Sequence, residues 1–193
     1  MREKISRACG RRGRQSLVAA DGGMRRVLVI GSPGSGKSTL ARQLGEKLQV
    51  PVIHLDFHFW KPGWQPVEAI VFRERVSELS AAPEWVMDGN YAQTFDIRIP
   101  RADTLVWLEC SRVTCVMRAL RRSLRGYGRS SAQLPAGCPE RIDYEFFRYV
   151  WDFPTKHRPG IVSGVEQLGR HLRLVHLCDN RARQEFLDAA EVG

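Results

Sequence analysis

The residues best suited to chemistry lie in one short stretch, GSPGSGKST at positions 31–39. It fits the pattern G-x-x-x-x-G-K-[ST] at every fixed position, which Gly31, Gly36, Lys37 and Ser38 occupy. Glycines let the backbone curl so that successive N–H groups point at an anion, and a following helix adds its positive N-terminal end. A chance glycine turn is the alternative, but an apolar run precedes the stretch and a helical pattern follows it. The stretch therefore predicts a phosphate-binding loop for a nucleoside triphosphate.

Each part of this loop has an expected role. Lys37 places a positive charge on the β and γ phosphates. Ser38 supplies a hydroxyl to Mg²⁺, and Thr39 lies beside it. The other residues that we expect to surround the phosphates are Gly31, Ser32, Pro33, Gly34, Ser35 and Gly36. ATP and Mg²⁺ are therefore the expected cofactors.

Two acidic residues follow short apolar runs that we interpret as strands. Asp88 comes after WVM at 85–87, where a carboxylate can hold Mg²⁺ through water; a turn cap is the alternative for an Asp before Gly. Asp56 comes after VIHL at 52–55 and can orient or deprotonate an acceptor hydroxyl, with a helix cap as the alternative. Alternation places His54 on the same side as Asp56, and we expect His54 to be structural.

An aromatic loop, FHFWKPGW, follows Asp56 directly. Aromatic rings beside Pro and Gly can form a flat-sided substrate pocket. The same rings can instead close the edge of the domain by packing. The residues concerned are Phe57, Phe59, Trp60 and Trp64.

Arginines concentrate in residues 112–129, which hold six arginines and no acid. Apolar spacing predicts a helix from Ser111 to about Arg125, in which Arg118 and Arg122 lie one turn apart. Like charges this close indicate an anionic ligand, whereas a solvated basic face is the alternative. The predicted core stripe of this helix is Val113, Val116, Met117, Leu120 and Leu124.

The stretch after this helix has the composition of a hinge. Gly126 and Gly128 flank Tyr127, and a Gly- and Pro-rich segment follows. Arginines that reach from a closing flap can neutralise a transferring phosphate and expel water. We expect Arg158, before Pro159-Gly160, to close the far side of this flap.

Strand and helix patterns alternate along the chain from Met24 onward. Apolar runs expected to be strands lie at 27–30, 52–55, 85–87, 104–108 and 173–177. Such alternation predicts an α/β domain over residues 24–193 with a doubly wound parallel sheet. In these sheets ligands bind at the carboxyl ends of the strands, where Asp56 and Asp88 are expected.

Composition and charge limit the other possibilities. The chain has 193 residues, 43% apolar, and no apolar run approaches the ~20 residues of a membrane span. The net charge of +9 arises from residues 112–129 and from residues 1–23, which carry six basic and two acidic side chains. We expect 1–23 to be a disordered tail, with Met24 as an alternative start and a nucleic-acid-binding arm as the other interpretation. Scattered cysteines and the lack of a secretory apolar segment predict a cytoplasmic protein.

Taken together, these stretches resemble the adenylate-kinase-like P-loop proteins known as DNA topology modulation proteins. The resemblance implies the nucleoside-monophosphate-kinase fold, with a five-stranded parallel sheet, an acceptor-binding region after the second strand and a small helical lid at about 118–160. It also implies catalytic roles for Asp88, Arg118, Arg122 and Arg158, and the role of acceptor-hydroxyl acid for Asp56. The matching stretches are GSPGSGKSTLA, HLDFHFWKPGW, WVMDGNY, RIPRADTLVWLE, the arginine helix, ERIDYEFFRYVWDF and RLVHL.

The match departs from adenylate kinases directly after Asp88-Gly89. Asn90 and Tyr91 stand where adenylate kinases carry an aromatic residue, a proline and an arginine for the monophosphate. The resemblance therefore does not extend to AMP as the acceptor.

Two functions follow from the sequence. The favoured one is a kinase that moves the γ-phosphate of Mg·ATP to a nucleotide or a small hydroxylated acceptor. The sequence does not fix its oligomeric state, although lidded kinases of this size can work as monomers. The region from Asp56 to Trp64, together with Arg98 or Arg101, is expected to hold the acceptor. The alternative is a nucleotide-dependent switch or slow ATPase that contacts DNA or a protein through the basic tail and the arginine helix. The kinase is favoured because the rest of the domain is not basic.

Overall fold

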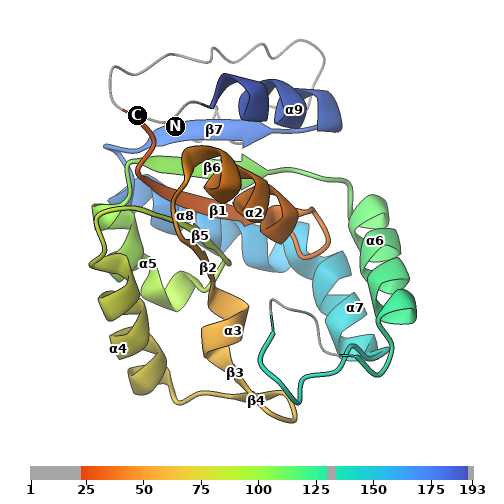
Figure 1. Ribbon diagram of the computed structural model, residues 1–193. Helices are drawn as coiled ribbons and strands as arrows, with labels where there is room; N and C mark the ends of the chain where they lie inside the picture. Colours follow the sequence, from red (N-terminus) through yellow and green to blue (C-terminus); the bar gives the residue numbers. More distant parts are fainter. Residues whose placement is uncertain (1–22, 130–133, 191–193) are drawn as a thin grey trace.

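A central parallel sheet positions the rest of the molecule (Figure 1). The computed structural model describes residues 23–129 and 134–190, so the expected tail, apart from its last residue, and positions 130–133 of the expected lid lie outside the described part. The strands follow the order β2-β5-β1-β6-β7, and all neighbours are parallel. They are β1 (Arg26–Gly31), β2 (Val52–His54), β5 (Trp85–Asp88), β6 (Thr104–Leu108) and β7 (Arg173–Leu177). The predicted α/β fold with a five-stranded parallel sheet is confirmed.

The strands are continuous apolar runs because both faces of the sheet are covered. In β1, the side chains of Leu28 and Ile30 pack into one layer, and those of Val27 and Val29 into the other. All four are fully buried. A strand buried on both faces has no solvent side, so it shows no polar alternation.

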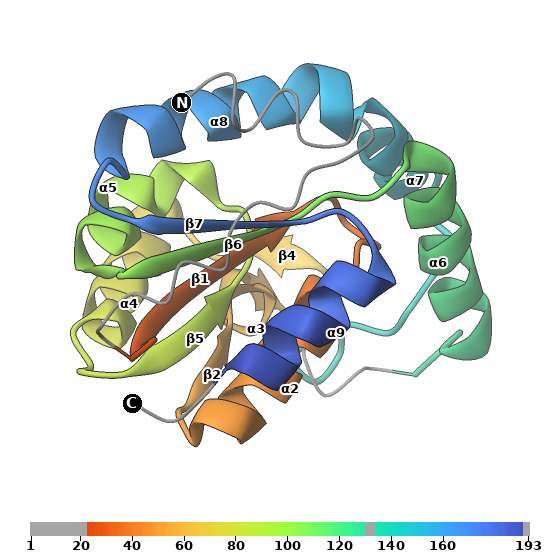
Figure 2. The ribbon, with the colours of Figure 1, turned by 90° about the horizontal axis from the view of Figure 1, so that it is seen from above.

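Helices cover the two faces of the sheet, as the view from above shows (Figure 2). α2 and α9 pack on one face, and α4, α5 and α8 on the other. The helices are α2 (Lys37–Leu48), α3 (Leu55–Phe59), α4 (Ala69–Ser80), α5 (Phe95–Arg98), α6 (Arg112–Arg125), α7 (Tyr144–Asp152), α8 (Arg158–Leu168) and α9 (Asn180–Ala189). Within the described ranges, none of them is long and apolar enough to cross a membrane.

Shorter elements connect these helices and strands. A small antiparallel pair, β3 (Trp60–Lys61) and β4 (Gln65–Pro66), follows α3. Single 3-10 turns at Ala92–Thr94 and Ile99–Arg101 flank α5, and a π-helical segment at Phe153–His157 joins α7 to α8.

The buried face of α6 is not the one that apolar spacing predicted. Its buried side chains are Cys115, Ala119 and Ser123, whereas Met117 is 59% exposed. Two other members of the predicted stripe, Val113 and Leu124, are also exposed. The predicted core stripe is therefore wrong at these three positions, whereas Val116 and Leu120 are half-buried. The small residues face inward because α6 lies close to the phosphate loop: a Cβ added at Gly34 would lie 2.4 Å from the carbonyl oxygen of Cys115.

We expect stability measurements to distinguish the two faces of α6. Ala119→Leu adds bulk on the buried face and should lower the free energy of unfolding by about 1–3 kcal/mol. Met117→Ala removes bulk on the exposed face and should change it by no more than about 0.5 kcal/mol. Urea unfolding followed by circular dichroism measures both. A larger loss for Met117→Ala than for Ala119→Leu would show that the packing of α6 is reversed.

Candidate active site

The phosphate loop has the context that its motif requires, because it joins the end of β1 to the start of α2. Three of its glycines, Gly31, Gly34 and Gly36, have φ of 146°, 80° and 99°. A Cβ at Gly31 would lie 2.4 Å from the carbonyl oxygen of Leu108, so the loop also passes too close to β6 for any side chain. Positive φ and close approach are both conditions that glycine alone meets cheaply.

Asn90 ties the start of this loop to the end of β5. Its Oδ1 accepts from the backbone N–H of Gly31 at 3.1 Å, and its Nδ2 donates to the Gly31 carbonyl at 2.9 Å. This pairing fixes the loop at its first glycine. No role was predicted for Asn90, although its place just after the strand beside β1 is a usable signal.

Lys37 spans the phosphate loop, and the charges of both candidate carboxylates, Asp56 and Asp88, act on it. Its Nζ donates to the Ser32 carbonyl at 3.0 Å. Burial lowers the pKa of Lys37, while the charges of Asp88 and Asp56 act in the opposite direction. The ammonium is therefore held where the loop curls, close to two acids from neighbouring strand ends.

Asp88 is paired with His54 on the adjacent strand. The two residues are register partners of β5 and β2, and His54 Nδ1 lies 2.6 Å from Asp88 Oδ1. Asp88 is only 5% exposed. Burial acts to lower the pKa of His54, but the hydrogen bond to Asp88 and the charge of Asp88 raise it above its ordinary value. His54 thus contacts the acid that the sequence assigned to the metal.

The donors near the loop fit a magnesium ion that also binds phosphate oxygens. Ser38 offers a hydroxyl in the first turn of α2, and Asp88 offers a carboxylate at the end of β5. Both are hard oxygen donors of the type that Mg²⁺ prefers. In the described part of the chain, no three His, Cys, Asp or Glu side chains form a metal cage. An ion at this place would therefore take its remaining ligands from the nucleotide and water.

Asp56 presents an oriented carboxylate in the first turn of α3. The Tyr91 hydroxyl donates a hydrogen bond to its Oδ1. Part of the Asp56 residue is exposed to solvent, but the protein around its carboxylate desolvates it and raises its pKa. The hydrogen bond from Tyr91 acts to lower this pKa. Burial and the charge of Asp56 raise the pKa of Tyr91, which keeps its hydroxyl protonated as the donor.

Arg98 does not reach toward an acceptor, contrary to one of the two expectations for that region. Its side chain is fully buried. The guanidinium donates to the carbonyls of Gly89, Asn90 and Tyr91 at 3.1, 2.7 and 3.2 Å, and to Thr94 Oγ1 at 2.9 Å. Burial lowers its pKa to about 9, so it is still charged at neutral pH. Arg98 therefore supports the turn that carries Asn90 and Tyr91.

Arg101, the other residue expected to hold an acceptor, also makes a structural contact. It is half-buried, and its Nη1 donates to the carbonyl of Ser77 on α4 at 3.3 Å. This bond directs the guanidinium toward the helix layer.

The three arginines assigned to the flap lie at three different places. Arg118 Nη1 donates to the carbonyl of Ser35 in the phosphate loop at 3.3 Å. Arg122 forms a 2.9 Å ion pair with Glu140 and lies over the ring of Phe146. The charge of Arg122 still acts on Lys37 and Asp56, so it lies near the loop.

Arg158, the first residue of α8, contacts Glu109, which directly follows β6. Its Nη2 is 3.2 Å from Glu109 Oε2, and its guanidinium is 5.3 Å from the centre of the Trp107 ring. His176 on β7 contacts the same carboxylate oxygen at 3.3 Å. The structure thus brings Arg118 and Arg122 toward the loop, while Arg158 is paired with Glu109.

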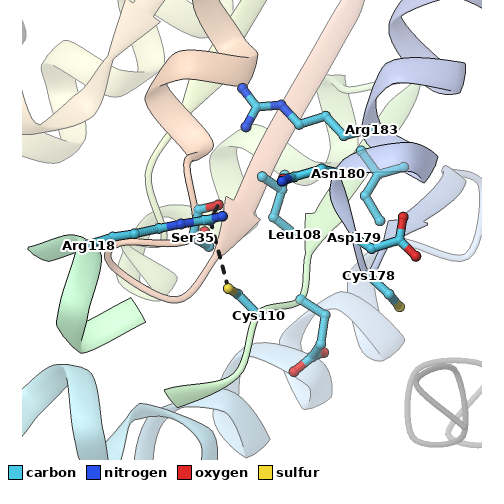
Figure 3. A pocket seen from close by; sticks show the side chains of 10 residues that line it. Ser35, Leu108, Cys110, Arg118, Cys178, Asp179, Asn180 and Arg183 are labelled. Carbon is cyan, nitrogen blue, oxygen red and sulfur yellow. Dashed lines mark hydrogen bonds between the residues drawn. The ribbon is translucent and has the colours of Figure 1, made fainter. Parts of the chain in front are cut away.

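A pocket of about 190 Å³ opens beside the loop, where β6, β7 and α9 meet it (Figure 3). Arg118 approaches it from α6 and Arg183 from α9. Burial lowers the pKa of Arg183, and the charge of Arg118 acts in the same direction. The lining residues are Ser35, Leu108, Glu109, Cys110, Arg118, Leu177, Cys178, Asp179, Asn180 and Arg183. Arg183 was not predicted as a site residue, because no motif in the sequence places α9 beside the loop.

Packing, one of the two roles expected for the aromatic loop, accounts for two of its rings. Phe59 packs in the core, with its ring centre 5.0 Å from that of Phe72 and 4.8 Å from that of Tyr91. Trp64 donates from Nε1 to the Pro139 carbonyl at 3.0 Å, which joins the β3–β4 turn to the segment before α7. Phe57 is 49% exposed. Packing therefore accounts for Phe59 and Trp64, and Phe57 stays accessible.

Comparison with solved structures shows the same fold in other proteins, a kinase among them. No protein-family model and no curated protein matches the chain. Shikimate kinase from Acinetobacter baumannii, solved with shikimate, superposes with a TM-score of 0.52 at 14% identity, over 86% of this chain and 89% of that one. The YorR protein of Bacillus subtilis, solved with phosphorylated GDP, gives a TM-score of 0.51 at 14% identity, over 84% and 91%. The chain has a P-loop kinase fold.

We expect Arg98 to be more important for stability than Arg101. Arg98→Leu leaves the carbonyls of the 89–91 turn without donors and should lower the free energy of unfolding by about 3 kcal/mol. Arg101→Leu removes one long hydrogen bond at a half-buried position and should cost about 1 kcal/mol or less. Urea unfolding of both variants measures the difference. Equal losses would contradict a supporting role specific to Arg98.

The contact between His54 and Asp88 leads us to a prediction about the pKa of His54. We expect the His54 pKa, followed by NMR of the imidazole in the Mg²⁺-free protein, to lie above the ~6.5 of an unfolded chain. Its stabilising contribution is then fully present below pH ~6.5 and is lost as the pH rises through the folded-state pKa. Asp88→Asn should lower the His54 pKa. An unchanged pKa in that variant would show that Asp88 is not the cause.

Proposed function

We propose that this protein is an ATP-dependent kinase that transfers the γ-phosphate of Mg·ATP to a small hydroxylated acceptor or a nucleotide. The observation that carries the proposal is the meeting of Lys37, Asp88 and Asp56 at the carboxyl ends of adjoining strands. A phosphate loop alone fits any nucleotide-binding protein. An exposed, oriented acid beside it provides what a phosphoryl acceptor needs.

In this proposal the phosphate loop and its neighbours hold the nucleotide. The backbone of residues 31–36 surrounds the phosphates, with Thr39 beside the loop, and Lys37 turns from the Ser32 carbonyl to the β and γ oxygens. Ser38 and Asp88 hold Mg²⁺, which neutralises phosphate charge when bound. The pocket between Arg118 and Arg183 takes the rest of the nucleotide, since it opens directly beside the loop.

The acceptor lies on the other side of the loop, at Asp56. Asp56 accepts the proton of the acceptor hydroxyl, and its raised pKa makes it a better base than an ordinary carboxylate. The hydrogen bond from Tyr91 fixes the carboxylate in one orientation. Tyr91 is therefore a positioning residue that sequence reasoning missed.

We propose that residues 118–160 act as the lid, within a domain that spans 24–193. Arg118 already contacts the loop, and Arg122 must exchange Glu140 for phosphate to act on the transferred group. Arg158 would act at the far side by leaving Glu109. Membership of the DNA topology modulation family belongs to this proposal and rests on the ordered sequence stretches.

The test is phosphoryl transfer from γ-labelled Mg·ATP by the full chain, with a panel of nucleosides, nucleotides, sugars and hydroxy acids. Label should move to an acceptor, and Lys37→Met should slow this by on the order of 100-fold or more. Lys47→Met is the matched control on the same helix, because Lys47 is exposed and contacts only the Asp188 carbonyl among the described partners. Label that appears solely as inorganic phosphate, whatever acceptor is added, would favour the nucleotide-dependent switch.

A further inference from the structure

The charge of the acceptor can be inferred from the side chains around Asp56, provided that the proposed kinase function holds. α3 and α7 flank the carboxyl ends of β2 and β5 (Figure 1). Asp56 lies on α3, and Tyr91 lies in the turn after β5 and donates a hydrogen bond to it. Tyr149 lies on α7, where it hydrogen-bonds with Asn90 and the charge of Asp56 raises its pKa. The acceptor side is therefore built from two tyrosines, an amide and two acids, Asp56 and the neighbouring Asp88.

The arginines that we considered for binding an acidic acceptor make their contacts within the protein. All the hydrogen bonds of Arg98 go to the turn at 89–91 and to Thr94, and its side chain has no exposed surface. Arg101 donates to the Ser77 carbonyl on α4. Arg73, on the same helix, pairs with Asp96 at 2.6 Å. A carboxylate or phosphate on the acceptor would have to break one of these contacts to gain a guanidinium.

The two cations that act most strongly on Asp56 also have other partners. Lys37 belongs to the phosphate loop. Arg122 is paired with Glu140, whose side chain is only 5% exposed. In the proposed kinase Arg122 leaves Glu140 only for the transferred phosphate, so it has no charge left for a second anion on the acceptor.

Two carboxylates already lie near each other on the acceptor side. Asp88 raises the pKa of Asp56, so the two carboxylates interact unfavourably. Bound ATP adds the charge of its phosphates, and Mg²⁺ with the loop neutralises only part of it. A second anion placed beside Asp56 would be desolvated without a counterion and repelled by its neighbours.

We propose that the acceptor is uncharged: a neutral hydroxylated compound of the nucleoside or sugar type, without a carboxylate or phosphate. Its hydroxyl oxygen attacks the γ-phosphorus, the bond from that phosphorus to the β–γ bridging oxygen breaks, and ADP leaves. The hydroxyl proton passes to Asp56. The products are a phosphate monoester, ADP and one proton, and no other reactant is needed. The tyrosines offer hydrogen bonds and ring faces to such a molecule.

The test uses acceptors in matched pairs that differ by one ionised group. The full chain is given γ-labelled Mg·ATP with adenosine or AMP, guanosine or GMP, glucose or gluconate, and glycerol or glycerate. We expect kcat/KM for the neutral member of the used pair to exceed that of the charged member by on the order of 100-fold. The nucleoside and sugar pairs separate the two sources of neutral hydroxyls.

Arg101→Ala tests whether Arg101 leaves Ser77 to bind an acidic acceptor, with Arg75→Ala as the matched control because Arg75 is exposed and pairs with Glu78. Both variants should give the same ratio of neutral to charged acceptor use. Preferential transfer to a charged member, or its selective loss in Arg101→Ala, would overturn the neutral acceptor while leaving the kinase intact. Lys37-dependent release of inorganic phosphate alone, with every acceptor unlabelled, would overturn the kinase itself.

Discussion

The site depends on the position of β5 between β2 and β1. In this parallel arrangement Asp88 is the register partner of both His54 on β2 and Val29 on β1. Parallel strands end at the same edge, so the loop after β1, the acid at the end of β5 and the acid after β2 must meet there. A different strand order would leave every sequence motif intact but would place the phosphate loop, Asp88 and Asp56 apart from one another. The turn at 89–91, supported by the buried Arg98, then places Asn90 on the phosphate loop and Tyr91 on Asp56.

Electrostatics at this edge is a balance of partly buried charges. Asp88 contacts His54 and acts on Lys37, so the same carboxylate stabilises charge on two neighbours. The almost completely buried Glu140 pairs in the same way with Arg122. Each pair offsets desolvation that either member alone would suffer. Binding a nucleotide must exchange some of these contacts for contacts to phosphate, and the exchange for Arg122 requires Glu140 to find water or another donor.

Close approach of backbones explains the inverted face of α6. Gly34 meets the Cys115 carbonyl so closely that no side chain fits between them. Small residues therefore line the inner face of α6, and Met117 with its apolar neighbours faces out. A hydrophobic stripe predicts burial only when a helix packs on a wide apolar surface. α6 packs instead against a glycine-rich loop and α7, where short distances favour small side chains.

The sequence alone determined the phosphate loop, the parallel sheet and the position of Asp56 and Asp88 at strand ends. These features depend on contiguous residues: glycines that tolerate positive φ, and apolar runs whose length and spacing set strand or helix. Tertiary structure decided the rest. Whether Arg98 binds a ligand or a turn, which partner Arg122 takes and which side of α6 is covered depend on residues far apart in the chain. Local patterns carry no information on such distances, because a guanidinium pairs with whichever acceptor the fold brings within reach.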